Sequence, residues 1–397
     1  MPPLALSWLR KTASGAIPAL LLGSIVVATI RADEPAVGLT RAAADREARR
    51  LWEDRVQQVR ADPERAAEVK AKRIELDGLK MPFAFQVFGP KPSGGRSLFL
   101  SMHGGGGAPP QVNDRQYENQ KTLYRPEEGI YLAPRAPTDT WDLWHQSHID
   151  RFFERLILDL VLFEEVDPDR VYLMGYSAGG DGVYQLAPRM ADRFAAAAMM
   201  AGHPNESKPL GLRNLPFNLH MGGDDAAFHR NEVARTYGDE LDALAQGDPG
   251  GYPHLVEIHD GKGHWMDRED ASAVPWMAKY RREAAPKTVV WYQDDVTHDQ
   301  FYWLAVPPGQ AKAGSTVKAT VDGQTIRVDR ADGVATLLIR LDDRLVDLDQ
   351  PIRVVARGRT RFEGKLARSS ATLARTLNER TDPKLMFAAE VAVDLTP

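Results

Sequence analysis

The sequence contains no cysteine among its 397 residues. This absence excludes a thiol nucleophile, thiolate metal sites, disulfides and a lipoprotein cysteine, and it leaves the stability of the fold to the core. A strong charge of either sign is also missing, because the formal net charge is -5. Such a composition gives no sign of nucleic-acid binding. The length predicts about two domains.

Charged residues are absent from residues 12–30, which follow Arg10 and Lys11. A basic segment, an uncharged stretch and a small-residue site at 30–32 are typical of an export signal. We therefore predict that residues 1–32 are a signal peptide and that the chain is exported to the periplasm or secreted. Because the stretch is only just long enough to cross a bilayer, an uncleaved membrane anchor is the alternative.

Residues 33–76 are predicted to form an N-terminal helical segment. From residue 40 onward this segment is rich in Ala, Arg and Glu and has only a thin apolar stripe. Asp62 followed by Pro63 indicates that one helix stops and another starts, with Asp62 as the N-cap. Charges of both signs favour a solvated surface over a partner-binding helix.

The clearest motif is Gly175-Tyr176-Ser177-Ala178-Gly179, which follows four apolar or β-forming residues. A strand, a Gly-x-Ser-x-Gly turn and a helix start together predict a nucleophile elbow. Ser177 is then expected on a strained backbone with its Oγ exposed. Glycine at positions 175 and 179 lets the strand and the helix pass closely without a Cβ clash.

Strand and helix patterns alternate around this motif, which predicts a mainly parallel sheet covered on both faces. Apolar residues at steps of three and four between Ile149 and Val161 predict a core helix. The expected strands, besides the one that leads into the motif, are 82–88, 96–102, 129–134, 194–200, 217–221 and 255–259.

A run of four glycines, 104–107, follows His103 at the end of the second expected strand. Glycines can point backbone N–H groups at a negatively charged oxygen without side chains in the way. We therefore expect Gly104 and Gly105 to form an oxyanion hole, together with the N–H of Ala178, the residue after the candidate nucleophile.

A nucleophilic serine needs a base and an orienting acid on loops after later strands. Asp224 and Asp225 follow the strand at 217–221, and His264 follows the strand at 255–259. His264 is the predicted base. The competing histidines lie inside or before strands, in the glycine loop or before Ser177, and they are His103, His145, His148, His220, His254 and His259.

These motifs together resemble the serine hydrolases of the α/β-hydrolase fold, over about residues 81–285. Within them, the chain is most similar to exported bacterial carboxylesterases of the polyhydroxybutyrate-depolymerase and feruloyl-esterase kind. The resemblance implies a Ser-His-Asp triad of Ser177, His264 and Asp225, because it places the acid in a Gly-x-x-Asp arrangement that starts at Gly222. It implies hydrolysis of carboxylic esters through an acyl-enzyme, with no cofactor and no metal.

The expected partner is an ester substrate, including polymeric or carbohydrate-linked esters, with no nucleic acid and no stable membrane insertion after signal removal. The residues expected to contact the substrate are aromatic side chains and one histidine near the motifs, namely Trp141, Trp144, His145, Tyr176 and Trp265.

Three other functions stay open from the sequence. A prolyl-oligopeptidase-like peptidase shares the motifs, but the chain lacks a propeller-sized N-terminal domain. A non-catalytic envelope binding protein on a hydrolase scaffold is the second. A metal hydrolase that uses Asp142, His145 and His148 is the third, although the glutamate of a zincin helix is missing.

Short alternating strands replace the strand and helix alternation from about residue 286. We therefore predict a catalytic domain at 77–285 and a small all-β domain with a terminal helix at 286–397. Asp322-Gly323 is a signal for a two-residue hairpin. The second domain is either a lid or packing domain, or a polymer-binding module whose aromatic residues stack on sugars, namely Trp291, Tyr292, Tyr302 and Trp303.

Overall fold

The structure, a computed structural model, describes residues 38–396. The predicted signal peptide lies outside the described residues. Among the residues that are described, no helix combines the length and the apolar character needed to cross a bilayer.

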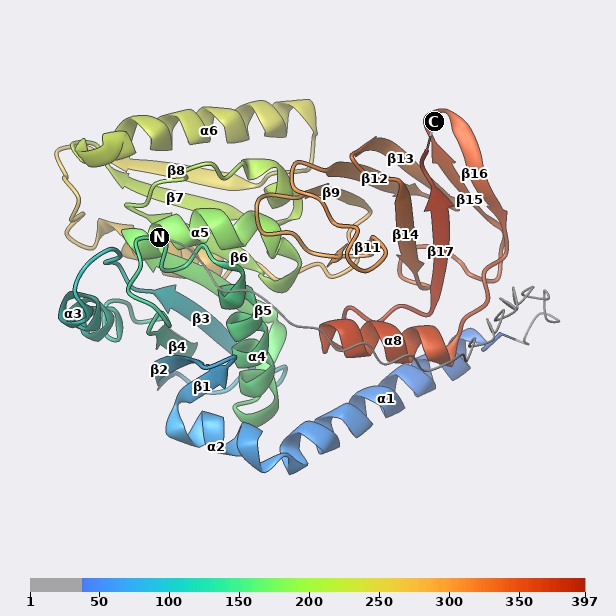
Figure 1. The fold of residues 1–397 in the computed structure, drawn as a ribbon, viewed down its shortest axis with the longest axis horizontal. Helices are drawn as coiled ribbons and strands as arrows, with labels where there is room; N and C mark the ends of the chain where they lie inside the picture. Colours follow the sequence, from blue (N-terminus) through green and yellow to red (C-terminus); the bar gives the residue numbers. More distant parts are fainter. Residues whose placement is uncertain (1–37, 397) are drawn as a thin grey trace, which may run out of the picture. The chain divides into compact units, whose positions relative to one another are not determined.

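An eight-stranded sheet carries the elbow motif (Figure 1), with the strand order β1-β2-β4-β3-β5-β6-β7-β8. The strands β1 and β2 are antiparallel to their neighbours, and all other pairs are parallel. This confirms the predicted α/β-hydrolase fold with its mainly parallel sheet. The strands are β1 (Arg73–Leu76), β2 (Leu79–Phe88), β3 (Arg96–Met102), β4 (Gly129–Pro134), β5 (Val166–Tyr176), β6 (Ala196–Met200), β7 (Phe217–Gly222) and β8 (His254–His259).

Both faces of this sheet are buried, as a parallel sheet requires. On β3, Leu98 and Leu100 pack into one hydrophobic cluster, whereas Phe99 between them packs into another together with Tyr172 of β5. The helices that follow the strands provide the cover (Figure 1). They are α3 (Pro110–Gln120), α4 (Ser147–Phe163), α5 (Ala178–Arg189), α6 (Arg230–Gly247) and the short α7 (Ala273–Met277).

The N-terminal segment contains α1 (Arg41–Ala61) and α2 (Pro63–Ala71). Asp62 caps α2 as predicted, because its carboxylate accepts a hydrogen bond from Glu64 N at 2.9 Å. The prediction of helix up to residue 76 was wrong. Lys72 takes a left-handed conformation with φ of 51° and ends α2, and residues 73–76 then pair with β2 as the edge strand β1.

Two further sheets lie beyond residue 286, with the orders β10-β11-β14-β17 and β16-β15-β13-β12-β9. Asp322 pairs with Thr325, which confirms the predicted hairpin between β12 and β13. The strands β16 and β17 were not predicted. The elements are β9 (Thr288–Tyr292), β10 (Gln300–Phe301), β11 (Leu304–Ala305), β12 (Thr316–Asp322), β13 (Thr325–Asp332), β14 (Thr336–Leu341), β15 (Ile352–Ala356), β16 (Arg359–Gly364), the predicted helix α8 (Ser370–Arg380) and β17 (Ala389–Asp394).

The aromatic residues of this C-terminal region lie mostly in its core. Trp291 and Tyr302 are each 3% exposed and Trp303 is completely buried. The indole N–H of Trp303 donates to the carbonyl oxygen of Pro286 at 2.7 Å. These three rings therefore cannot stack on a sugar, which argues against the polymer-binding module built on them.

A buried ion-pair cluster joins the C-terminal region to the residues around the large sheet. Asp382, after α8, accepts hydrogen bonds from Arg193 at 2.9 Å and from Arg282 at 2.7 Å. Burial alone would raise the pKa of Asp382, but the two guanidinium groups hold it well below its usual range. These contacts favour the packing interpretation of the C-terminal region.

Replacing Asp382→Asn is expected to lower the free energy of unfolding by about 3 to 5 kcal/mol, because two buried guanidinium groups lose the carboxylate that they share. Urea denaturation followed by circular dichroism measures this loss. The matched control is Asp394→Asn, since Asp394 is exposed and its carboxylate accepts hydrogen bonds from the nearby Thr396. The control should change stability by less than about 0.5 kcal/mol, and equal losses in the two variants would contradict the prediction.

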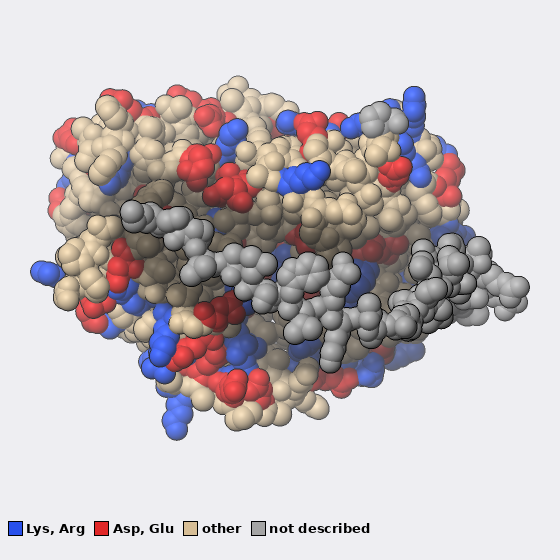
Figure 2. Space-filling model, viewed as in Figure 1, with Lys and Arg blue, Asp and Glu red and all other residues tan. Residues whose placement is uncertain are grey.

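Charged side chains of both signs are mixed on the face drawn in Figure 2. Blue and red groups alternate there, in line with the small formal net charge of -5. Mixed charges of this kind produce no extended field of one sign.

Candidate active site

Ser177 lies on the sharp turn between β5 and α5. Its backbone has φ of 60° and ψ of -124°, a strained conformation for a residue with a side chain. A Cβ added at Gly175 would lie 2.2 Å from the carbonyl oxygen of Gly179, and one at Gly179 would lie 2.1 Å from that of Met102. Glycine is therefore required at both positions. At Gly175 the reason is the expected close approach of strand and helix, whereas at Gly179 it is contact with the neighbouring strand β3.

His264 and Asp225 form a hydrogen-bonded row with Ser177. The Nε2 atom of His264 lies 2.9 Å from Ser177 Oγ, and its Nδ1 atom lies 2.7 Å from Asp225 Oδ2. A carboxylate only accepts, so Nδ1 carries the hydrogen and Nε2 is free to accept the serine proton. The row has the geometry that general-base activation of a serine needs.

Asp225 and Asp224 differ sharply in surroundings. Asp225 is 3% exposed, and its second oxygen lies 3.5 Å from Arg230 Nη1. Asp224 is exposed, and its backbone N–H donates to the carbonyl oxygen of Lys262. Only Asp225 reaches the imidazole of His264.

Tyr176 holds the loop that carries His264. Its hydroxyl donates to the carbonyl oxygen of His264 at 2.6 Å and accepts from the N–H of Met266 at 3.2 Å. Tyr176 also lines the cavity at Ser177 but is largely buried. Its hydroxyl therefore serves the loop, whereas the sequence suggested a contact with substrate.

The glycine loop is fixed by His103. Burial lowers the pKa of His103 to about 4, so the ring is neutral. Its Nε2 accepts from the N–H of Ala136 at 3.1 Å, and its Nδ1–H donates to the carbonyl oxygen of Gly104 at 2.6 Å. Gly104 lies against Ser177, because a Cβ added to it would be 3.0 Å from the Cβ of Ser177.

Two backbone features make N–H groups available beside Ser177. Gly105 has φ of 114°, a conformation that favours glycine. Ala178 is the first residue of α5, so its N–H has no carbonyl partner within the helix. These are the positions that the sequence suggested for an oxyanion hole.

Asn113 is a supporting residue that the sequence did not reveal. Its Oδ1 accepts from the N–H of Gly106 at 2.9 Å, and its amide donates to Asp139 Oδ1 at 2.8 Å. Arg230 beside Asp225 was also missed. Asn113 lies on α3 and Arg230 begins α6, and each helix brings the side chain back to the loop before it. No spacing rule in the sequence signals such a contact.

A cavity of about 640 Å³ opens at Ser177 and is lined by Gly104, Gly105, Tyr176, His264 and Trp265 among others. Trp265, one of these lining residues, is half exposed to solvent. Trp141 is 64% exposed and lies against Gly106 and Gly107, beyond the residues that line the cavity.

Besides Trp141, two more residues predicted to contact the substrate do not line this cavity. Trp144 is completely buried, and its indole N–H donates to the carbonyl oxygen of His103 at 3.0 Å. His145 is buried, with its ring edge-on to Trp141. Both predictions were wrong, because Trp144 packs against His103 and His145 packs against Trp141. Among residues 38–396, no group of three or more His, Asp or Glu side chains is placed to hold a metal ion, and Asp142, His145 and His148 form none.

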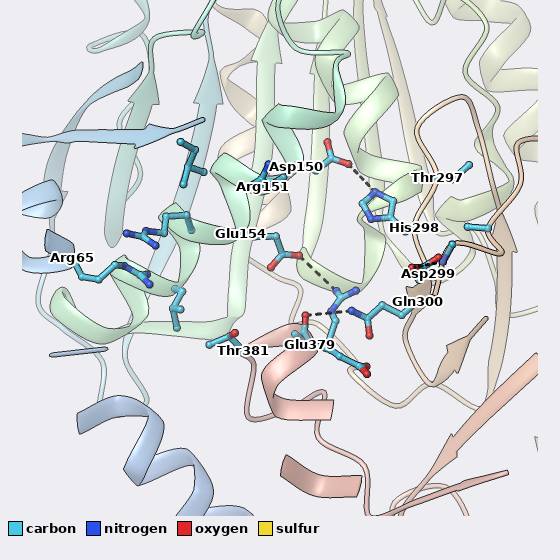
Figure 3. Close-up of a pocket in the computed structure, with 16 residues that line it drawn as sticks. Arg65, Asp150, Arg151, Glu154, Thr297, His298, Asp299, Gln300, Glu379 and Thr381 are labelled. Carbon is cyan, nitrogen blue, oxygen red and sulfur yellow. Dashed lines mark hydrogen bonds and ion pairs between the residues drawn. The ribbon is translucent and has the colours of Figure 1, made fainter. Parts of the chain in front are cut away.

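A larger cavity of about 840 Å³ lies elsewhere, between α4, the loop at 297–300 and the end of α8 (Figure 3). Several of its charged groups form ion pairs, some within the lining and some with residues behind it, such as Arg65 with Asp159. His298 bonds Asp150 at 2.8 Å, and Arg380 lies 3.9 Å from Glu154. This cleft contains neither Ser177 nor His264.

The strand order and the elbow define the class of fold, which is that of the α/β-hydrolases. Residues 120–292 match the Dienelactone hydrolase family. The matched range includes the residues of the hydrogen-bonded row and ends before most of the C-terminal region.

Two curated relatives are esterases by name. A bifunctional acetylxylan esterase/xylanase of Neocallimastix patriciarum is 30% identical over 161 residues, which are 38% of this chain and 23% of the relative. A putative esterase of Nocardia uniformis subsp. tsuyamanensis is 32% identical over 127 residues, 30% of this chain and 37% of the relative. The chain thus matches well under half the length of either relative.

Among solved structures, a thermostable esterase aligns with a TM-score of 0.41 and 18% identity, and the alignment covers 53% of this chain and 62% of that one. The similarities of this chain thus lie with a hydrolase family and with proteins named as esterases.

Proposed function

We propose that this protein is a serine esterase that hydrolyses carboxylic esters through an acyl-enzyme on Ser177. The observation that carries the proposal is the row of Asp225, His264 and Ser177, joined at 2.7 and 2.9 Å on the strained elbow. A serine hydroxyl is a weak nucleophile until an adjacent base accepts its proton.

In the proposed reaction, Ser177 Oγ attacks the ester carbonyl carbon while His264 Nε2 takes the hydroxyl proton. The N–H groups of Gly104, Gly105 and Ala178 stabilise the oxyanion. The intermediate collapses, and His264 gives its proton to the departing alkoxide. A water molecule then attacks the acyl-enzyme by the same route in reverse, which releases the acid and restores the serine.

Asp225 keeps the imidazole of His264 in the required tautomer and stabilises the imidazolium that forms in each step. Arg230 Nη1 lies 3.5 Å from the other oxygen of this carboxylate. The reaction as proposed uses no cofactor and no metal, since the serine, the base and the N–H donors supply its chemistry.

The substrate class and the cellular location extend the proposal. We propose esters that include polymeric or carbohydrate-linked ones, because one relative is an acetylxylan esterase by name. Trp265 at the cavity edge is the candidate contact for such a substrate. We also propose that residues 1–32 export the chain, on the sequence pattern of that segment.

The purified protein should turn over acyl and aryl esters, and a fluorophosphonate probe should label it at Ser177. Activated esters release their alcohol readily, so they are the most sensitive probe of acyl transfer. Peptide anilides serve as the comparison, because faster turnover of these would support the peptidase alternative. A protein that neither cleaves any ester nor takes up the probe contradicts the esterase proposal.

A further inference from the structure

Two parallel histidine rings, in contact edge to edge, join the strand that leads to the acid and the strand that leads to the base. His220 lies on β7, which runs towards Asp225, and His259 ends β8, which runs towards His264 (Figure 1). The ring centroids are 5.3 Å apart with the planes at 10°. His220 Nδ1 and His259 Nε2 lie 3.0 Å apart, so one of them donates a hydrogen bond to the other.

The surroundings of His220 decide which nitrogen carries its hydrogen. Its Nε2 lies 2.5 Å from Asn218 Oδ1 and 3.2 Å from Glu257 Oε2. The amide nitrogen of Asn218 is already used, because it donates to the carbonyl oxygen of Leu255. Both neighbours are acceptors, so His220 donates from Nε2.

His220 is neutral, because burial first and the neighbouring His259 second lower its pKa to about 3. Its Nδ1 therefore accepts, and His259 donates from Nε2. The Nδ1 of His259 faces Glu269 Oε2 at 3.2 Å. The Lys262 ammonium, 3.0 Å from Glu269, lowers the pKa of that carboxyl, so Glu269 is ionised and only accepts.

Both nitrogens of His259 thus face acceptors, and both must carry hydrogen. We propose that His259 is a positioning residue for the catalytic base. As an imidazolium it links His220, on the strand β7 that leads to Asp225, to the loop of residues 260–269 that carries His264. The identity of His264 as the base rests on the proposed function. The protonation of His259 rests only on the hydrogen-bond geometry.

The backbone of His259 also contacts both segments that carry the acid and the base. Its carbonyl oxygen accepts from Gly223 N at 2.8 Å and from Lys262 N at 3.2 Å. Lys262 also pairs with Asp267 at 2.9 Å, beyond His264 in the chain. If His259 lost its Nδ1 proton, the Nδ1 lone pair and Glu269 Oε2 would be two acceptors in contact. Glu269 would then lose its hydrogen bond to His259, and the loop that carries His264 would be held less firmly.

Other charged groups lie near this histidine pair. Asp270, whose pKa burial raises, lies next to Glu269 in the chain, and Asp260 follows His259. Glu257 contacts His220 on the side away from His259. The protonation of His259 therefore rests on its two hydrogen-bond partners alone.

Nuclear magnetic resonance of the full chain with ¹⁵N-labelled histidine tests the protonation directly. At about pH 6.5, His259 should show two protonated ring nitrogens and His220 only one. In Glu269→Gln the new amide can donate to Nδ1, so His259 should then show one protonated nitrogen. A singly protonated His259 in the unmodified protein overturns the proposal, whether or not the protein cleaves esters.

Kinetics test the positioning role. His259→Gln should lower kcat about tenfold with KM within about twofold, because the base is displaced while the cavity is kept. The control is His254→Gln at the other end of β8, where the side chain bonds Asp242 instead. In the unmodified protein kcat should decline on the alkaline side, and in Glu269→Gln this decline should disappear.

Equal kcat values in His259→Gln and His254→Gln would overturn the positioning role. If His259→Gln does not fold, Glu269→Gln decides, because Glu269 is half exposed and Lys262 retains Asp267. An alkaline decline that persists in Glu269→Gln overturns the proposal. A protein inactive on every ester would remove the proposed function and leave the resonance result to decide the state of His259.

Discussion

Replacing Ser177→Ala is expected to lower kcat for ester hydrolysis by about 10³-fold or more. The variant keeps His264 and the N–H donors beside the elbow, but it has no hydroxyl to form the acyl-enzyme. The rate of aryl-ester hydrolysis measures the loss of turnover, and labelling with a fluorophosphonate probe measures the loss of the nucleophile. Labelling should vanish together with turnover.

Ser93→Ala is the control for this experiment, since Ser93 lies exposed in the loop between β2 and β3. It should be labelled and turn over esters like the unmodified protein. A metal chelator should change neither protein. Turnover that is lost in chelator, in a protein whose Ser177 remains unlabelled, would falsify the serine mechanism.

The second large effect is expected at Asp225. Asp225→Asn should lower kcat by about 10² to 10⁴ while the fold is kept. The introduced amide can donate to His264 Nδ1, which favours the tautomer whose Nε2 carries hydrogen and cannot accept the serine proton. It also removes the charge that stabilises the imidazolium.

Asp224→Asn is the matched control, because it makes the same chemical change at the adjacent residue. Asp224 is exposed and does not reach His264, so kcat should fall by less than about tenfold. Side-by-side measurement of kcat at one pH decides between the two residues. A larger loss at Asp224 would reverse the assignment of the acid.

The elbow was predictable because its constraints are local. The strand before Ser177, the glycines on each side and the helix start after it are neighbours in sequence. The strained φ at Ser177 and the close approach of Gly175 to Gly179 arise within that short stretch, whereas Gly179 also lies against Met102 of β3. The same holds for the helix cap at Asp62, which involves residues only two positions apart.

The choice between Asp224 and Asp225 needed more than the residues themselves. Position in the chain left both carboxylates available, and only the resemblance to a family favoured Asp225. The structure separates them, because the turn after β7 buries one side chain against His264 and leaves the other in solvent.

The failed predictions concern packing between distant segments. The Trp144 ring was expected at the substrate, but it fills the space under His103. Residues 73–76 read as helix by composition, but pairing with β2 makes them a strand. In both cases tertiary contacts override a preference that is weak within the segment itself.

The sequence by itself determined the alternation of strands and helices, the elbow at Ser177 and the order of serine, acid and base along the chain. Each of these depends on periodicity or on residues a few positions apart. The tertiary structure decided which carboxylate faces His264, which aromatic rings are buried and that His220 meets His259. The contacts of Asp225 with His264 and of His220 with His259 each join residues 39 positions apart in the chain. Over such distances sequence spacing carries no geometric information.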